Sequence, residues 1–226
     1  MPFYNELQQA TRSGQEYLLT APIIQQVFDG HFTIETYMAF LHQAFHHVKH
    51  TVPLLMAAGA RLGDDHEWAR KTIHGYIEEE YGHEAWILDD LVACGCDRET
   101  WATSAAPYHS EIMVSFLYDY VQRKNPMGIF GMVLVLEGTS SSLAPEVARL
   151  VQQKLGLPDA AMTYLTTHGE LDQDHIGYFE RAMDRVTSAE DQSAIIHVAN
   201  TVYRLYGDVY RSLPAAAEAL KAGKAA

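Results

Sequence analysis

Helical periodicity runs through almost the whole chain of 226 residues, and this pattern limits the fold more than any other feature. Apolar residues recur three and four positions apart, as in "TIETYMAFLHQAFHHVKHTVPLLMAAGARL" and "SAEDQSAIIHVANTVYRLYGDVYRSL". No segment alternates apolar and polar residues as a half-buried strand does. The pattern therefore predicts an all-α protein, a single compact bundle of seven to eight helices with short connections.

The predicted bundle occupies residues 1–213 as one domain, and an Ala/Lys-rich tail follows over residues 214–226. We expect the tail to start as a helix and then fray. Pro53 is expected to bend the long helical segment around it, because proline removes a backbone donor. Residues 64–95 read as one helix, which opens on aspartates and closes at a glycine.

Charge and cysteine content restrict the partners and the location. The chain carries 16 Lys and Arg against 29 Asp and Glu, a formal net charge of −13, which argues against nucleic acid or an anionic membrane as partner. We find no signal peptide and no apolar run of the length that spans a membrane. Cys94 and Cys96 are too close in sequence to favour a mutual disulfide. We interpret them as reduced thiols of a cytoplasmic protein.

The stretch "HGELDQDH", residues 168–175, places acids and imidazoles in the middle of an otherwise ordinary amphipathic helix. At about 100° per residue, His168, Asp172 and His175 lie within about 60° of one another. Two imidazoles and one carboxylate would then point to one spot, while Glu170 and Asp174 point away. The alternative is a solvated polar face.

Two further segments supply donors of the same kind. Glu80 and His83 stand at i, i+3 in "EEEYGHEAW", the Glu-x-x-His spacing of helical di-iron sites, although flanking glutamates also fit a charged surface. Glu137 ends the apolar stretch "GIFGMVLVL" and is expected to be buried, so it needs a partner. A structural salt bridge is the alternative. Gly138 beside it is expected to allow a close approach between helices.

Together these residues form a candidate metal site with three imidazoles, three carboxylates and no thiolate. Such a set suits two ions of iron, with manganese as the alternative, rather than structural zinc. The predicted ligands are Glu80, His83, Glu137, His168, Asp172 and His175.

A second group of histidines resembles a metal site but lacks carboxylates. His42, His46 and His50 follow one another at i, i+4, i+8. We expect one or two of them to face the central cavity, as contacts to the ligands or to a substrate. Tyr37 and Tyr76 are candidates for the same role, with ordinary helix packing as the alternative.

At these residues the chain resembles the haem-oxygenase-like diiron oxidases, which share their helical fold with haem oxygenase, thiaminase II and the pyrroloquinoline-quinone-forming oxidase. The resemblance covers roughly residues 10–212 and rests on Glu80-x-x-His83, the lone Glu137 and His168-x-x-x-Asp172-x-x-His175. It implies two iron ions, the second weakly held, and dioxygen as co-substrate. No early histidine is placed like the proximal ligand of haem oxygenase, so we expect no haem.

The resemblance implies an oxidoreductase that oxidises a small organic molecule of the amino acid, fatty acid or amine class. One alternative is a metal-free enzyme of the thiaminase II or quinone-forming type. Against it, the thiaminase nucleophile should be a cysteine on the middle helix, where this chain has Glu137 and no thiol. Another alternative is a non-enzymatic helical ligand-binding protein. The sequence leaves open a homodimer and an external electron donor.

Overall fold

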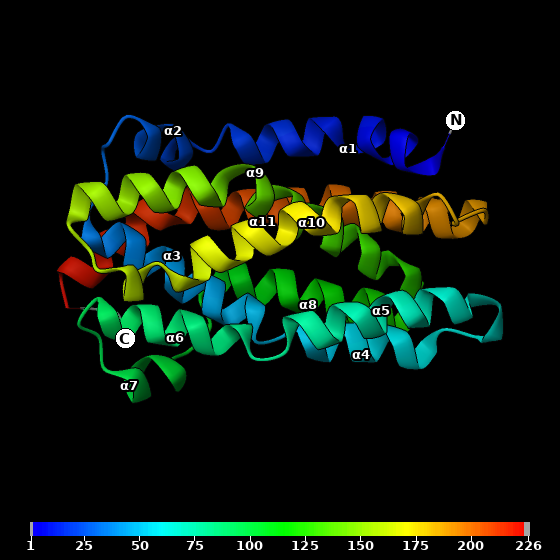
Figure 1. Ribbon diagram of the computed structural model, residues 1–226, viewed down its shortest axis with the longest axis horizontal. Helices are drawn as coiled ribbons and strands as arrows, with labels where there is room; N and C mark the ends of the chain where they lie inside the picture. The colour runs from blue at the N-terminus through cyan, green and yellow to red at the C-terminus, as the bar shows by residue number, and fades with distance from the viewer. Residues whose placement is uncertain (1, 224–226) are drawn as a thin grey trace.

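The computed structural model describes the backbone of residues 2–223 and the side chains of residues 2–167 and 177–223 (Figure 1). Within these ranges the chain forms helices and no strand, so the all-α prediction is confirmed. The α-helices are α1 (Phe3–Leu19), α2 (Pro22–Phe28), α3 (Ile34–Val48), α4 (Thr51–Arg61), α5 (Glu67–Glu80), α6 (His83–Ala93), α7 (Arg98–Ala102), α8 (Tyr108–Arg123), α9 (Ile129–Leu155), α10 (Thr163–Met183) and α11 (Ala189–Lys221). Short 3-10 helices precede α5, α9 and α10, at Asp64–His66, Pro126–Gly128 and Asp159–Ala161.

Two segments that the sequence predicted as continuous are each divided into two helices. Between α3 and α4 the helix is interrupted at Lys49 and His50, because Pro53 cannot donate to the Lys49 carbonyl and its ring crowds that group. The predicted helix over residues 64–95 is divided at Tyr81 and Gly82. Gly82 has φ of +93°, a left-handed conformation that ends the helical ladder.

The helices pack in layers around α11. Helix α11 contacts α1, α3, α8 and α9, and α10 lies along α9 and also touches α6. In Figure 1, α1 and α2 run along one long edge of the bundle and α4, α5 and α6 along the opposite edge, with α9 and α11 between them. The N-terminal half of α9 is therefore surrounded by other helices.

One close contact between helices involves a glycine that the sequence did not single out. A Cβ on Gly131 would lie 2.5 Å from the Ile195 carbonyl oxygen and 2.6 Å from the Ala199 nitrogen, so α9 and α11 meet there backbone to backbone. The expectation that Gly138 serves this purpose is wrong. A Cβ at Gly138 would meet no atom of the described residues within 4 Å, so no close helix contact is seen there among them.

Helix α9 is also unusually apolar. The helix over Pro126–Leu155 contains an 18-residue window with a mean hydropathy of 1.4, so it is long and apolar enough to cross a membrane by length and composition alone. Of this apolar window, 61% is buried inside the bundle. The buried core helix of a globular protein can have the same length and apolar composition.

The C-terminal segment continues the last helix. Helix α11 runs through Pro214 to Lys221, and Leu213 and Ala217 are buried against the rest of the bundle. The first part of the predicted tail is thus helical, as expected, and residues 224–226 lie outside the described range.

Candidate metal centre

A cavity inside the bundle brings together two of the predicted ligands, Glu80 at the end of α5 and Glu137 in the middle of α9. Its wall also includes His47 and Tyr76. The remaining described lining residues are Val48, Thr51, Leu55, Met132, Val133, Leu136, Ser140, Tyr164 and Tyr206. The space measures about 530 Å³, its mouth included. We call it the polar cavity.

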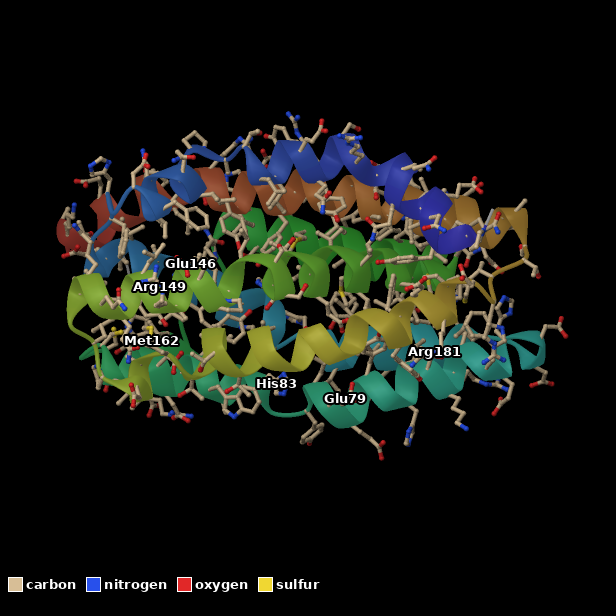
Figure 2. All side chains as sticks on the ribbon, turned by 45° about the horizontal axis from the view of Figure 1, so that its top comes forward. Glu79, His83, Glu146, Arg149, Met162 and Arg181 are labelled. Carbon is tan, nitrogen blue, oxygen red and sulfur yellow. The ribbon has the colours of Figure 1, made fainter. Side chains whose placement is uncertain are left out.

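Glu80 and His83 lie on the two sides of the break between α5 and α6. Glu80 is the last residue of α5, His83 is the first of α6, and both are buried. The His83 Nδ1 lies 3.2 Å from the Glu80 Oε2, and the imidazole stacks on Trp86 with ring centroids 4.0 Å apart. Figure 2 labels His83 at this junction. The pair is held together as predicted from its spacing, but by a turn at Gly82 rather than by one continuous helix.

Glu137 reaches the same cavity from α9. The sequence predicted a buried carboxylate, because the helix before it is apolar. The structure shows a half-buried residue that lines the polar cavity. Two carboxylates from helices that are distant in sequence therefore share one space.

Helix α10 carries the other three predicted ligands, His168, Asp172 and His175. Their side chains lie outside the described residues, so their roles as ligands remain predictions. The helix itself packs against α9, which carries Glu137, and against α6, which carries His83.

His42 and His46 are held together on α3 by one hydroxyl group. The Nε2 atoms of His42 and His46 lie 2.9 Å and 3.0 Å from the Ser104 Oγ, and that hydroxyl donates to the Trp101 carbonyl. Burial and the positive charge of Lys49 lower the pKa of His42 to about 4 and that of His46 to about 3. Both imidazoles are therefore neutral at neutral pH.

A different histidine of the same helix reaches the polar cavity. The histidine among the described lining residues of the polar cavity is His47, and its ring contacts that of Tyr206. His50 instead places its Nδ1 3.1 Å from the Tyr118 hydroxyl. The sequence contained a signal for His47. Thr36, Phe40 and His47 share one stripe at i, i+4, i+11, and the first two line the neighbouring chamber described below.

The two tyrosines proposed from the sequence face different spaces. Tyr76 is 1% exposed and lines the polar cavity, with its ring 5.9 Å from that of Tyr178. Tyr37 is also buried, but its hydroxyl donates to the Ala161 carbonyl at 2.6 Å and its ring faces the neighbouring chamber. Burial raises the pKa of Tyr37 well above its usual value.

Asp90 is a structural residue of the site that sequence reasoning missed. It is fully buried on α6 and accepts the backbone N–H groups of Thr163 and Tyr164, the first residues of α10. Burial raises its pKa to about 6, although both backbone donors oppose that shift. In the sequence Asp90 directly follows Asp89, and such an acidic pair is typical of an exposed surface. The sequence therefore did not indicate this role.

The described donors fit an ion that prefers nitrogen and oxygen. Glu80 and Glu137 line one cavity, His83 contacts Glu80, and neither Cys94 nor Cys96 is among the described residues of its wall. Within residues 2–167 and 177–223, no three such side chains already converge tightly enough to hold a metal. The prediction of a metal site therefore requires ligands from α10, whose side chains lie outside the described residues.

Comparison with known proteins identifies the family. Residues 38–207 match the family described as iron-containing redox enzymes, and this range includes all six predicted ligands. The chain belongs to this family. No curated protein matches the sequence.

Solved structures confirm the haem-oxygenase-like fold. A domain from Shewanella denitrificans with a haem-oxygenase-like fold is 21% identical, with a TM-score of 0.86 over 99% of this chain and 96% of that one. A TenA homologue from Pseudomonas syringae is 12% identical, with a TM-score of 0.75 over 94% and 93% of the two chains. Haem oxygenase-1 from Synechocystis, solved with haem, is 10% identical, with a TM-score of 0.75 over 99% and 97%. These identities support a shared fold and no more.

Proposed function

We propose that this member of the iron-containing redox enzyme family is a nonhaem diiron oxidase or oxygenase that oxidises a small organic molecule. The observation that carries the proposal is the shared cavity of Glu80 and Glu137, with His83 in contact with Glu80. Two carboxylates that line one cavity would favour a bound cation, because like charges repel each other and burial removes hydration.

Different residues of this chain would bind the metal and contact the substrate. Glu80, His83 and Glu137 would hold the metal together with His168, Asp172 and His175 of α10. Bound iron would supply the electrons that reduce dioxygen, and an external donor would restore them. His47 and Tyr76 place an imidazole and a phenol on the cavity wall, where they can orient a substrate or exchange a proton. Burial of Tyr76 and Glu80 would limit the access of bulk water to the reacting groups.

The test is a titration of the metal-free protein with Fe(II) under anaerobic conditions, read by calorimetry and by iron content after gel filtration. Wild type should bind two equivalents, the second more weakly. Glu80→Gln and Glu137→Gln should each lose at least one equivalent, because an amide does not replace the charge of a carboxylate. Glu78→Gln is the matched control, since Glu78 is exposed on the same helix as Glu80.

Equal iron binding by wild type and all three variants would show adventitious iron and would overturn the proposal. Oxygen uptake by the loaded protein supplies a second readout. It should depend on Glu80 and Glu137 and be unaffected by the Glu78 substitution.

A metal-free enzyme of the thiaminase type is the second candidate, favoured by the structural similarity to a TenA homologue. The thiols of this chain do not support it. Cys94 and Cys96 follow α6 at its C-terminal end, and burial raises the pKa of Cys94 to about 12, which disfavours the nucleophilic thiolate. Reduced thiols of this kind fit the cytoplasmic location that we propose for the protein.

A further inference from the structure

A second, larger space adjoins the polar cavity. It lies among α2, α3, α9, α10 and α11, and its empty space, including the open mouth, is about 790 Å³. Ser140, Tyr164 and Tyr206 line both spaces and form their common wall. We call this second space the apolar chamber.

The described lining of the apolar chamber contains no charged residue and no histidine. Aliphatic and aromatic side chains such as Ile23, Phe40, Leu143 and Leu213 form most of its wall. Among its hydroxyl groups, that of Tyr37 is already committed to the Ala161 carbonyl. An ionised group placed here would lose its hydration without a countercharge, at a cost of several kcal/mol.

One face of α9 connects the chamber to the predicted metal ligand. Ser140, Ala144, Val147 and Val151 line the chamber at i, i+4, i+7, i+11, and Glu137 precedes Ser140 by three residues on the same face. At about 1.5 Å per residue, Ser140 and Val151 are about 16 Å apart along the helix. The chamber is therefore elongated, with one end at the polar cavity.

We propose that the apolar chamber binds the uncharged hydrocarbon part of the substrate, an alkyl or aryl-alkyl group. The group to be oxidised lies at the Ser140 end, next to Glu137. This inference rests on the proposed function for the reaction, but the binding itself requires no metal. Ala144 lies near the Ser140 end of the chamber and Val151 at its far end. These two residues therefore set the length of the hydrocarbon chain that the protein accepts.

The test measures binding of 1-hexanol and 1-decanol to the metal-free protein by calorimetry. Ala144→Phe fills the chamber next to Ser140 and should weaken both alcohols tenfold or more. Val151→Phe fills the far end and should weaken 1-decanol tenfold while leaving 1-hexanol within twofold of wild type. Gln153→Phe is the matched control, because it adds the same ring at an exposed position of α9.

A competition experiment tests the requirement for an uncharged ligand. The dication of 1,10-diaminodecane should fail to displace 1-decanol, since it cannot enter without burying a charge. Leu143→Ala enlarges the chamber instead of filling it, so it tests the inference even if a phenylalanine variant fails to fold. This substitution should change the affinity for 1-decanol at least threefold.

Absence of 1-decanol binding to wild type, equal effects of Val151→Phe on both alcohols, or displacement by the dication would each overturn the inference. Metal titration of the same proteins separates the two proposals. Loss of alcohol binding with two iron ions still bound contradicts only the chamber. Length-dependent alcohol binding without specific iron binding supports the chamber and contradicts the diiron function.

Discussion

The carboxylate of Asp90 on α6 accepts the backbone N–H of Tyr164 on α10 at 2.9 Å, and its second oxygen accepts that of Thr163 at 3.0 Å. A buried side chain of one helix thus caps the first turn of another. The relationship joins the helix that begins at His83 to the helix that carries His168, Asp172 and His175. It also places Tyr164 at the wall shared by the polar cavity and the apolar chamber.

Substitution of this cap should loosen the start of α10. Asp90→Ala leaves two backbone donors without their acceptor, and we expect the free energy of unfolding to fall by about 1–3 kcal/mol. Urea denaturation measures the change. Asp89→Ala is the control, because Asp89 is exposed and pairs with Arg98 at the surface, so its loss should cost less than about 1 kcal/mol. Equal losses in the two variants would contradict the capping role.

Bound metal should stabilise the folded protein. Glu80 and Glu137 share the polar cavity, so a divalent cation relieves their repulsion and binds only the folded state. At a hundredfold excess over its dissociation constant, Fe(II) or Mn(II) should add about 2.7 kcal/mol, whereas Mg(II), which prefers all-oxygen sites, should add much less. Calorimetric melting of wild type and Glu137→Gln measures the gain, which should shrink on acidification as the ligands take up protons. An identical gain in both proteins would place the ion elsewhere.

The histidine pair on α3 should make stability depend on pH. The pKa values of His42 and His46 are about 4 and 3 in the folded protein, below the ordinary value of about 6.5 expected for the unfolded chain. As the pH falls below about 6.5, the unfolded chain takes up protons first. The stabilisation present above that pH is therefore lost progressively down to the folded pKa values.

His46→Gln isolates this effect, because glutamine retains a donor for Ser104 but does not titrate. Urea denaturation between pH 4 and pH 7 should show a shallower decline for the variant, by up to about 1.4 kcal/mol per pH unit for one proton. Asp90 titrates in the opposite sense, but it is present in both proteins and cancels in the comparison. Parallel curves would show that the pKa of His46 is the same in the folded protein and in the unfolded chain, which would contradict this prediction.

The two glycines of α9 should respond differently to alanine. At Gly131 the added Cβ meets backbone atoms of α11, so Gly131→Ala should destabilise the protein by about 1–3 kcal/mol. At Gly138 the added Cβ meets no atom of the described residues within 4 Å, and alanine should be neutral or stabilise the helix by up to about 1 kcal/mol. Thermal melting of both variants measures the difference, and a loss at Gly138 as large as at Gly131 would contradict the packing described here.

Sequence spacing indicated one contact of the candidate site but not the backbone geometry that produces it. The spacing of Glu80 and His83 indicated that the two side chains belong together, and the structure places them in contact. It did not indicate that Gly82 divides the helix between them, because a single glycine is tolerated inside a helix as well as at its end. The ligand roles of His168, Asp172 and His175 remain predictions.

The sequence by itself determined the all-α class and the predicted donor set, since helical period and residue chemistry are local properties of the chain. Only the tertiary structure decided that His47, rather than His46, reaches the polar cavity. Adjacent residues point about 100° apart, and the rotation of α3 against its neighbours selects between them. The Asp90 cap and the apolar chamber depend in the same way on packing between distant segments, because each exists only where separate helices meet.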